Sequence, residues 1–283
     1  MITTEGKVYV KRYLAQQVPA IAQSIGFGIG DKAEAVGDTK LQFEIGRTDI
    51  NLVSYDFVNN KLIFKASVPD NIGGKIYEAA LFSLPASAGR AEAGSRLITT
   101  FDSATEVWVD ATSGATATYD ATNARIGSDA IRHTPAASGS KTDALKDIAL
   151  DLSGYSAADK FVLALNAGNS FTSTVTARFL TDTSNYYQIS FGSPTVGYNV
   201  VESTKGSATV TGSPSWANIT EVRVTTNSTA GGASQIDFDG LRLDDSDTIS
   251  ADDIMVSREL LATPFVKIDG MTQEIEFALD VSV

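Results

Sequence analysis

The sequence predicts a mainly β protein, in which a small β-rich base domain with one N-terminal helix is interrupted by an inserted jelly-roll β-sandwich. The middle of the chain carries many short β-prone runs separated by turn signals, a pattern typical of sandwiches. Residues 272–283 alternate strictly between apolar and polar, as expected of a half-buried strand. This C-terminal segment is too short to fold alone, so we expect its apolar face to join a sheet formed by the N-terminal residues.

A single helix is expected near the N-terminus. Residues 4–18 begin with a capping residue, Thr4, and Pro19 follows as a terminator. Three apolar side chains at helical spacing would form the buried face of this helix: Val8, Leu14 and Val18.

The strands of the base domain follow the helix. β-prone runs occupy residues 49–55, 61–68 and 75–82, and Asn59-Asn60 provides a tight hairpin turn between the first two. The run Gly26-Phe27-Gly28-Ile29-Gly30 has some features of a phosphate-binding loop, but the acidic residues after it would repel phosphate. We interpret this run as a turn.

Strands are also expected throughout the middle of the chain. They are predicted at residues 106–110, 130–133, 145–152, 161–166, 175–180, 186–191, 198–202, 219–225 and 234–243. Solvated linkers are predicted at residues 85–94 and 244–248. The predicted domains are therefore a base at residues 1–85, an inserted sandwich at 97–246, and the returning strands of the base at 254–283.

Composition excludes several functions. The chain of 283 residues has no cysteine and one histidine, which excludes thiol chemistry and multi-histidine metal centres. Its 22 basic and 34 acidic residues give a net charge of −12, which opposes nucleic-acid binding. No apolar run approaches the roughly 18 residues of a membrane-spanning helix, so no membrane insertion is expected. The N-terminal residues lack a signal-peptide pattern, so we expect synthesis in the cytoplasm.

We expect no enzymatic activity. His133, the only imidazole, lies in a predicted strand, and the chain has no Gly-x-Ser-x-Gly nucleophile motif. A glycosidase that uses paired carboxylates stays open as an alternative, because the sequence does not show how far apart its acidic side chains lie.

Aromatic side chains are the candidate ligand-binding groups, because flat rings suit the apolar faces of sugars. Four of them are candidate glycan-binding residues in the predicted sandwich: Trp108, Tyr119, Tyr187 and Tyr198. Aromatic residues on alternating strands more often belong to the core. We therefore expect at most one exposed aromatic platform.

Five segments in the middle of the chain carry a family resemblance. They are Thr100-Phe101-Asp102, residues 126–132, residues 150–156, Asn185-Tyr186-Tyr187 and residues 236–243. In this order they resemble jelly-roll carbohydrate-binding modules with a galactose-binding-like fold. In many such modules acidic residues of the first and last strands bind a structural calcium ion, which by motif position implies Asp102 and Asp239 as metal ligands. The resemblance implies no other cofactor.

The N-terminal region carries a second resemblance. Its segments are residues 26–30, residues 38–44 with Arg47, and residues 77–82. Together they resemble domains of tailed-bacteriophage virion proteins of the tail-fibre, tail-tip or capsid-decoration type. The resemblance implies a place on the virion surface after synthesis in the host cytoplasm. Other virion proteins and copies of the same chain are the implied partners.

These observations lead to one functional hypothesis with two alternatives. The hypothesis is a non-enzymatic structural protein on the outer surface of a tailed-phage virion. Its base would anchor it to the particle, and its sandwich would project and adhere weakly, in many copies, to cell-surface glycans. The alternatives are a free or cell-surface carbohydrate-binding module and a carboxylate-based glycan hydrolase.

Overall fold

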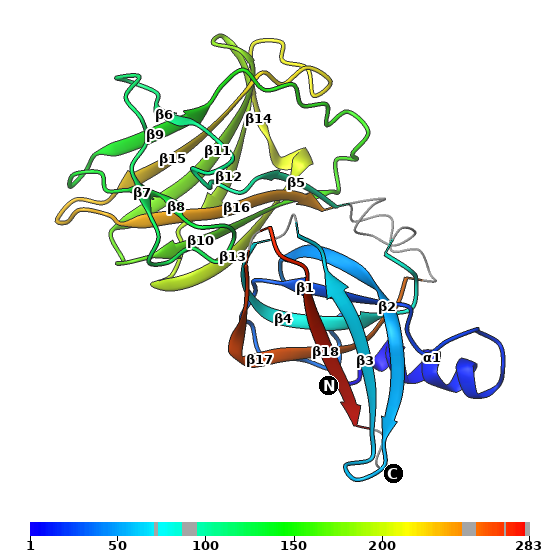
Figure 1. Cartoon of the computed structure of the whole chain (residues 1–283). Coiled ribbons are helices and arrows are strands. Elements are labelled where there is room, and N and C mark those ends of the chain that lie inside the picture. Colours follow the sequence, from blue (N-terminus) through cyan, green and yellow to red (C-terminus); the bar gives the residue numbers. More distant parts are fainter. Residues whose placement is uncertain (71–72, 87–94, 245–252, 269, 281–283) are drawn as a thin grey trace. The chain divides into compact units, whose positions relative to one another are not determined.

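The computed structural model describes residues 1–283 except 71–72, 87–94, 245–252, 269 and 281–283. The chain divides into two compact units, Met1–Ser95 with Thr248–Val283, and Arg96–Asp247. The described residues form one α-helix and three antiparallel sheets (Figure 1), which confirms the predicted mainly β fold with an N-terminal helix. Most of each predicted linker lies outside the described residues.

The first unit contains a nearly closed, barrel-like sheet with the strand order β17-β4-β1-β2-β3-β18. Its strands are β1 (Ser24–Gly28), β2 (Glu44–Asp56), β3 (Lys61–Val68), β4 (Gly74–Phe82), β17 (Met255–Lys267) and β18 (Gln273–Asp280). β17 pairs with β4, and β18 pairs with β3. Figure 1 shows the red strand β18 beside the cyan strand β3. Both ends of the chain therefore build this sheet.

The C-terminal strand β18 has the predicted alternation. Ile275, Phe277 and Leu279 are buried and belong to the core that the six strands enclose. Glu274 lies on the opposite face, where its carboxylate is 3.1 Å from the ammonium of Lys65. The period of two was sufficient to assign the faces of this strand.

The helix differs from the prediction in its cap and its buried face. Helix α1 (Thr4–Leu14) is capped by Thr3, whose hydroxyl accepts a hydrogen bond from the N–H of Gly6 at 2.9 Å. Tyr9 is the buried large side chain, whereas Val8 and Leu14 of the predicted stripe are 56% and 74% exposed. A side chain at Gly6 would overlap the backbone of Val256, so a close backbone contact determines which face is buried. The described residues contain no helix that is long and apolar enough to span a membrane.

The glycine run near residue 26 forms a buried central strand, not the predicted turn. Strand β1 pairs with both β2 and β4. The fully buried carboxylate of Glu78 accepts hydrogen bonds from the N–H groups of Gly30 at 3.1 Å and Phe43 at 2.9 Å. The guanidinium of Arg258 lies 2.9 Å from the same carboxylate. A Cβ at Gly28 would come within 2.6 Å of Glu78 Oε1, so glycine makes room for the buried ion pair.

The hairpin between β2 and β3 has a longer turn than predicted. Asp56 pairs with Lys61, which leaves a four-residue loop, residues 57–60, in place of the two-residue Asn59-Asn60 turn. Asp56 Oδ1 accepts a hydrogen bond from the N–H of Val58 at 2.9 Å. Asn60 adopts a φ of 53°, the left-handed conformation that asparagine tolerates.

The second unit is a sandwich of two antiparallel sheets. One has the order β13-β10-β16-β8-β7, with β5 also paired to β16, and the other has the order β14-β12-β11-β15-β9-β6. The first sheet contains β5 (Ser95–Thr99), β7 (Tyr119–Asp120), β8 (Ala130–His133), β10 (Lys160–Ala167), β13 (Gly197–Thr204) and β16 (Ile236–Asp244). The second contains β6 (Trp108–Asp110), β9 (Ser140–Leu145), β11 (Thr172–Asp182), β12 (Asn185–Gly192), β14 (Thr209–Thr211) and β15 (Glu221–Ser228). A short 3₁₀ helix, η1 (Lys205–Ser207), follows β13.

The two sheets of the sandwich share one apolar core. Phe161 of β10 and Phe179 of β11 come from different sheets, and their rings stack with centroids 4.5 Å apart. Alternating side chains of β11 enter this core, namely Val175, Ala177 and Phe179. The intervening side chains of β11 therefore lie on the outer face of the sheet.

Most of the predicted sandwich strands overlap observed ones, and β8 matches its prediction. The predicted strand at residues 145–152 is wrong, because β9 ends at Leu145 and Leu150 forms only an isolated bridge with Ile219. The strands β5, β7 and β14 and most of β9 were not predicted. These short strands lack a run long enough for alternation to be recognised.

Candidate functional site

The two predicted calcium ligands, Asp102 and Asp239, bind the same loop. Asp102 follows β5, and its two carboxylate oxygens accept hydrogen bonds from the N–H and the hydroxyl of Ser128, both at 2.9 Å. Asp239 lies in β16 and accepts hydrogen bonds from the N–H of Ile126 at 3.1 Å and the hydroxyl of Tyr198 at 2.9 Å. The two carboxylates thus fasten residues 126–128 to the first and last strands of the sandwich.

These contacts do not fit a calcium site. Calcium requires a shell of oxygen acceptors, whereas N–H and O–H donors surround the carboxylates of Asp102 and Asp239. Burial raises the pKa of Asp239 to about 6, although its donors favour the charged form. Across the described ranges, no three acidic or histidine side chains are grouped so that they could hold a metal ion. The N–H donors of residues 126–128 connect Asp102 and Asp239, a role that the calcium ion was expected to have.

Trp108 is a core residue. Its side chain is fully buried, and its ring centroid lies 4.9 Å from that of Phe101. Its indole N–H donates a hydrogen bond to Glu106 at 2.9 Å. Contrary to the prediction, Trp108 therefore offers no ring face to a ligand.

The three predicted tyrosines are half-buried, and each hydroxyl makes a structural hydrogen bond. Tyr119 donates to the carbonyl of Glu106 at 3.2 Å, and burial raises the pKa of its phenol. Tyr187 donates to the carbonyl of Pro214 at 2.9 Å, and Tyr198 donates to Asp239.

One ring face of each of two of these tyrosines is also covered. The ring of Tyr187 stacks on Trp216 with centroids 3.8 Å apart, and the guanidinium of Arg125 lies 3.3 Å from the ring centroid of Tyr198. The four predicted aromatic residues belong to four different strands, distributed over both sheets. The structure therefore does not bring them together as one sugar platform.

His133 lies in the core and is fully buried. Its Nδ1 is 3.1 Å from the hydroxyl of Thr226, and its Nε2 is 3.1 Å from Asp143 Oδ2, the latter without hydrogen-bond geometry. Burial lowers the pKa of His133 and favours the neutral imidazole. Because no atom of this side chain reaches the surface, the imidazole is not accessible to a substrate in solution.

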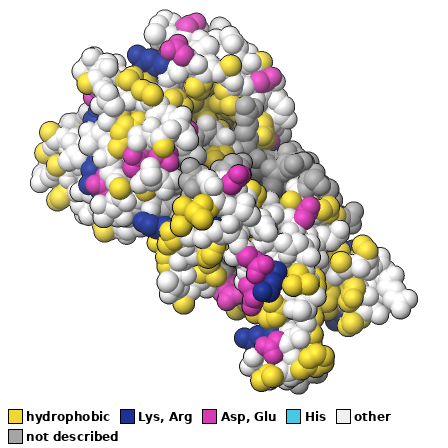
Figure 2. Space-filling model, in the orientation of Figure 1, with side chains coloured by type: hydrophobic (Ala, Val, Ile, Leu, Met, Phe, Trp, Pro, Cys, Tyr) yellow, Lys and Arg dark blue, Asp and Glu magenta, His cyan; other side chains and the backbone are white. Residues whose placement is uncertain are grey.

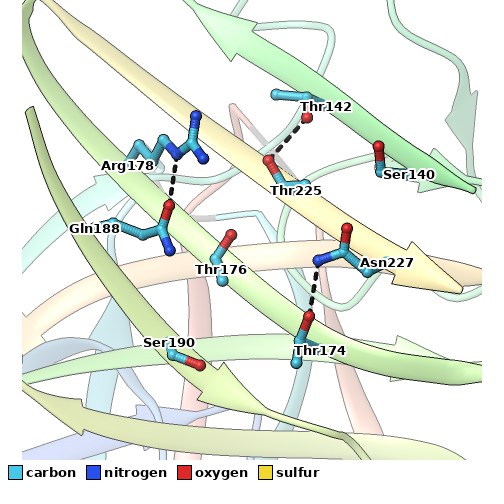
Figure 3. Close-up of a pocket in the computed structure, with 9 residues that line it drawn as sticks. All are labelled: Ser140, Thr142, Thr174, Thr176, Arg178, Gln188, Ser190, Thr225 and Asn227. Carbon is cyan, nitrogen blue, oxygen red and sulfur yellow. Dashed lines mark hydrogen bonds between the residues drawn. The ribbon is translucent and has the colours of Figure 1, made fainter. Parts of the chain in front are cut away.

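A polar groove crosses the outer face of the second sheet of the sandwich. It encloses about 510 Å³, a volume within the usual range of ligand sites. Figure 3 shows its nine lining side chains, which come from four adjacent strands. They are Ser140 and Thr142 of β9, Thr225 and Asn227 of β15, Thr174, Thr176 and Arg178 of β11, and Gln188 and Ser190 of β12. All nine are polar, and none is acidic.

The strand register arranges these side chains in rows across the groove. One row contains Thr142, Thr225, Thr176 and Ser190, which face one another on successive strands. The hydroxyls of Thr142 and Thr225 are hydrogen-bonded at 2.8 Å. In the next row Asn227 donates to the hydroxyl of Thr174 at 2.7 Å, as the dashed line in Figure 3 shows. Hydroxyl and amide groups are thus held at fixed spacing by the backbone.

Arg178 is the single charged side chain of this lining. Its Nε donates a hydrogen bond to Gln188 Oε1 at 2.7 Å. Its guanidinium carbon lies 4.8 Å from the ring centroid of Tyr186. Tyr186 precedes Gln188 by two residues on β12, so its ring lies on the outer face of the same sheet. The guanidinium is therefore held by the hydrogen bond to the amide of Gln188 and by the contact with the ring of Tyr186.

Sequence reasoning missed this groove. The alternation of Thr176 and Arg178 with core residues was visible in the sequence and predicted a strand with one core face. The groove arises only when β9, β15, β11 and β12 lie side by side, and the sequence does not show which strands are neighbours.

Comparison with known proteins finds no matching family model and no matching curated protein. Among solved structures, the family 11 carbohydrate-binding module of Clostridium thermocellum is 12% identical, with a TM-score of 0.41, over 54% of this chain and 96% of that one. The glycoside hydrolase domain of Endo-D from Streptococcus pneumoniae R6 is 15% identical, with a TM-score of 0.30, over 47% of this chain and 20% of that one. An agarase, AgWH50C, is 9% identical, with a TM-score of 0.37, over 54% of this chain and 25% of that one.

These similarities are remote and concern the β fold alone. The chain spans a quarter or less of the length of the two enzymes. The matched carbohydrate-binding module is covered over 96% of its length. None of the three structures is described as a virion protein.

Proposed function

We propose that this protein binds glycans through the polar groove of its sandwich and does so without catalysis. One observation carries the proposal: nine polar side chains from four adjacent strands converge on a groove of about 510 Å³. Most small-molecule pockets are lined mainly by apolar side chains. A lining made of hydroxyl, amide and guanidinium groups instead suits a ligand whose surface consists of hydroxyl groups.

The chemistry of the lining supports binding over hydrolysis. A carboxylate-based hydrolase needs two carboxyl groups that flank the scissile bond. The nine described side chains of the groove include neither aspartate nor glutamate. Hydroxyl groups such as those of Thr176 and Thr225 can both donate and accept, so they can match the hydroxyl groups of a sugar in either role.

The test is binding of the full chain to a glycan array, followed by titration of each retained glycan. Thr176→Val with Thr225→Val removes two hydroxyls from the central row while keeping the side-chain shape. We expect this double variant to weaken binding by about thirtyfold, because two lost hydrogen bonds of about 1 kcal/mol each amount to about 2 kcal/mol. The matched control is Thr209→Val with Thr211→Val on β14, in the same sheet but outside the lining. A wild-type chain that retains no glycan, or equal affinities for the two double variants, would contradict the proposal.

We also propose the virion surface as the place where this protein acts. The support is the resemblance of the N-terminal segments to domains of tailed-bacteriophage virion proteins. The test is mass spectrometry of purified particles of a phage whose genome encodes this chain. Absence of the chain from those particles would contradict the proposal.

A further inference from the structure

Among the described residues Arg178 has no acidic partner, and this distinguishes it from its neighbour Arg223. Within the described parts of the chain, its contacts are with the amide of Gln188 and the ring of Tyr186. Arg223 is its direct cross-strand neighbour on β15 and lies on the same outer face. The guanidinium of Arg223 pairs with Glu221 at 2.6 Å. Of these two adjacent arginines, Arg223 is paired with a carboxylate, whereas Arg178 is paired with none among the described residues.

The hydrogen bond of Arg178 to Gln188 uses Nε and leaves the two terminal nitrogens for another acceptor. Figure 3 shows this bond as a dashed line from Nε to the amide oxygen of Gln188. The two terminal nitrogens form the end of the planar fork that binds a carboxylate or a sulfate with two parallel hydrogen bonds. Because Gln188 and Tyr186 hold the plane, little conformational freedom is lost when an anion binds.

We propose, on the basis of the proposed glycan-binding function, that the groove selects sugars that carry an oxyanion and that Arg178 determines this specificity. The oxyanion is the carboxylate of a uronic acid or the sulfate of a sugar ester. A neutral sugar would leave the guanidinium without its charged partner.

The net negative charge of the middle of the chain disfavours densely charged ligands. Residues 85–247 hold 11 basic and 18 acidic residues, a difference of −7. This excess repels a densely charged polyanion, although salt at about 0.1 M screens the repulsion beyond about 10 Å. The groove therefore suits a glycan in which charged sugars are sparse among neutral ones.

The experiment compares wild type, Arg178→Gln and Arg223→Gln on an array of uronate-containing, sulfated and neutral oligosaccharides. Both substitutions remove one positive charge from the same face, but only Arg178 lines the groove. We expect the wild type to retain glycans with an oxyanion. Arg178→Gln should weaken that binding by about tenfold to a hundredfold, since hydrogen bonds to charged groups are the strong ones. Arg223→Gln should change it by less than about twofold.

Two further arms identify the chemistry. Chemical reduction of the carboxyl groups of a retained uronate glycan should lower its affinity to that of a neutral glycan. Retention of sulfated glycans alone would assign the site to sulfate. Arg178→Lys keeps the charge and loses the fork, so it should bind with intermediate affinity. Thermal unfolding of each variant confirms that the fold is intact.

The outcomes separate this inference from the proposed function. Retention of neutral glycans with equal effects of Arg178→Gln and Arg223→Gln would overturn the specificity inference. If Thr176→Val with Thr225→Val still weakened binding in that case, the glycan-binding function would stand. If the wild type retained no glycan of any class, both proposals would fall.

Discussion

Asp239 is a carboxyl group whose protonation is coupled to folding. It is buried in the last strand of the sandwich, and burial raises its pKa from an ordinary value of 3.8 to about 6. In the folded state the carboxyl group therefore keeps its proton at pH values where the unfolded chain has lost it. Its contribution to stability is present below about pH 4 and is lost as the pH rises through 6.

Asp239→Asn isolates this contribution. The difference in unfolding free energy between wild type and variant should fall by about 3 kcal/mol from pH 4 to pH 7, because a shift of about two pKa units corresponds to that energy. Urea unfolding at pH 4, 5, 6 and 7 measures it. Other carboxyl groups titrate in both proteins and cancel in the difference. A difference that does not depend on pH would show that Asp239 has an ordinary pKa in the folded state.

Gly127 is a position where even an alanine side chain is expected to destabilise the fold. Its φ is 64°, and a Cβ there would overlap the carboxylate of Asp102. Gly114 has a similar φ of 74° with nothing within 4 Å of a built Cβ. Gly127→Ala should therefore lower the free energy of unfolding by about 1 kcal/mol for the left-handed conformation and by a further ~1–3 kcal/mol for the overlap. Gly114→Ala should lower it by the first amount only. Chemical denaturation measures both, and equal losses would mean that Asp102 can move aside freely.

At the scale of elements, the β2–β3 hairpin combines a polar turn with exposed apolar side chains. Phe57 and Val58 in its loop are 83% and 88% exposed, and Leu52 and Val53 are about half exposed. The ring of Phe57 contacts that of Tyr55 edge to face, with centroids 4.7 Å apart. Because the loop is stabilised by Asp56, these apolar groups are not needed for the turn itself.

Phe57→Ser with Val58→Ser tests the role of this hairpin in self-association. We expect the unfolding free energy to change by less than about 0.5 kcal/mol, since both side chains are exposed. We expect the tendency of the chain to form oligomers to decrease, because the exposed apolar area is smaller. Sedimentation velocity at several concentrations measures this. If the variant formed oligomers with an unchanged dissociation constant, the interface would not involve this hairpin. If the wild type were a monomer at all concentrations, the expectation of self-association would be wrong.

The elements that sequence could predict were those whose pattern is local. β3 and β18 were predicted closely, because a β-prone run or strict alternation marks each strand from end to end. The glycine strand β1 was missed because its conformation depends on Glu78 and Phe43, which lie far along the chain. The buried face of α1 was missed for a similar reason, since Val256 contacts it from the opposite end of the sequence.

The candidate site was beyond sequence reasoning for a different reason. Aromatic residues were expected to bind sugars, but the largest of them, Trp108, fills the core. The groove consists of serine, threonine, asparagine and glutamine residues that resemble any other exposed polar residues in the sequence. Only the cross-strand register shows that they lie together around Arg178.

At the scale of the whole molecule, the first unit depends on the C-terminal segment. β18 supplies Ile275, Phe277 and Leu279 to its core and pairs with β3 along its whole length. Among the described residues, the core of the second unit consists of residues of that unit. Loss of β18 should therefore damage one unit and spare the other.

Truncation after Met271 tests this division. We expect the amides of β1–β4 to lose hydrogen-exchange protection, because the core of the first unit is opened and the edge of β3 is exposed. The amides of β10, β11 and β15 in the second unit should keep their protection and serve as the internal control. Hydrogen exchange with mass spectrometry measures both in one sample. Native protection of β1–β4 in the truncated chain would mean that the N-terminal strands fold without β18.

The discontinuous sheet of the first unit also sets an order of events during synthesis. β1 to β4 leave the ribosome early, but β17 and β18 follow only after the sandwich has been translated. At ~5–20 residues per second, the 172 residues between Phe82 and Met255 take about 9–34 s. During that interval the sandwich can complete its sheets, while the early strands wait with two edges unpaired. The nascent chain therefore exposes the edges of β3 and β4 before its last strands are made, and unpaired strand edges favour aggregation at that stage.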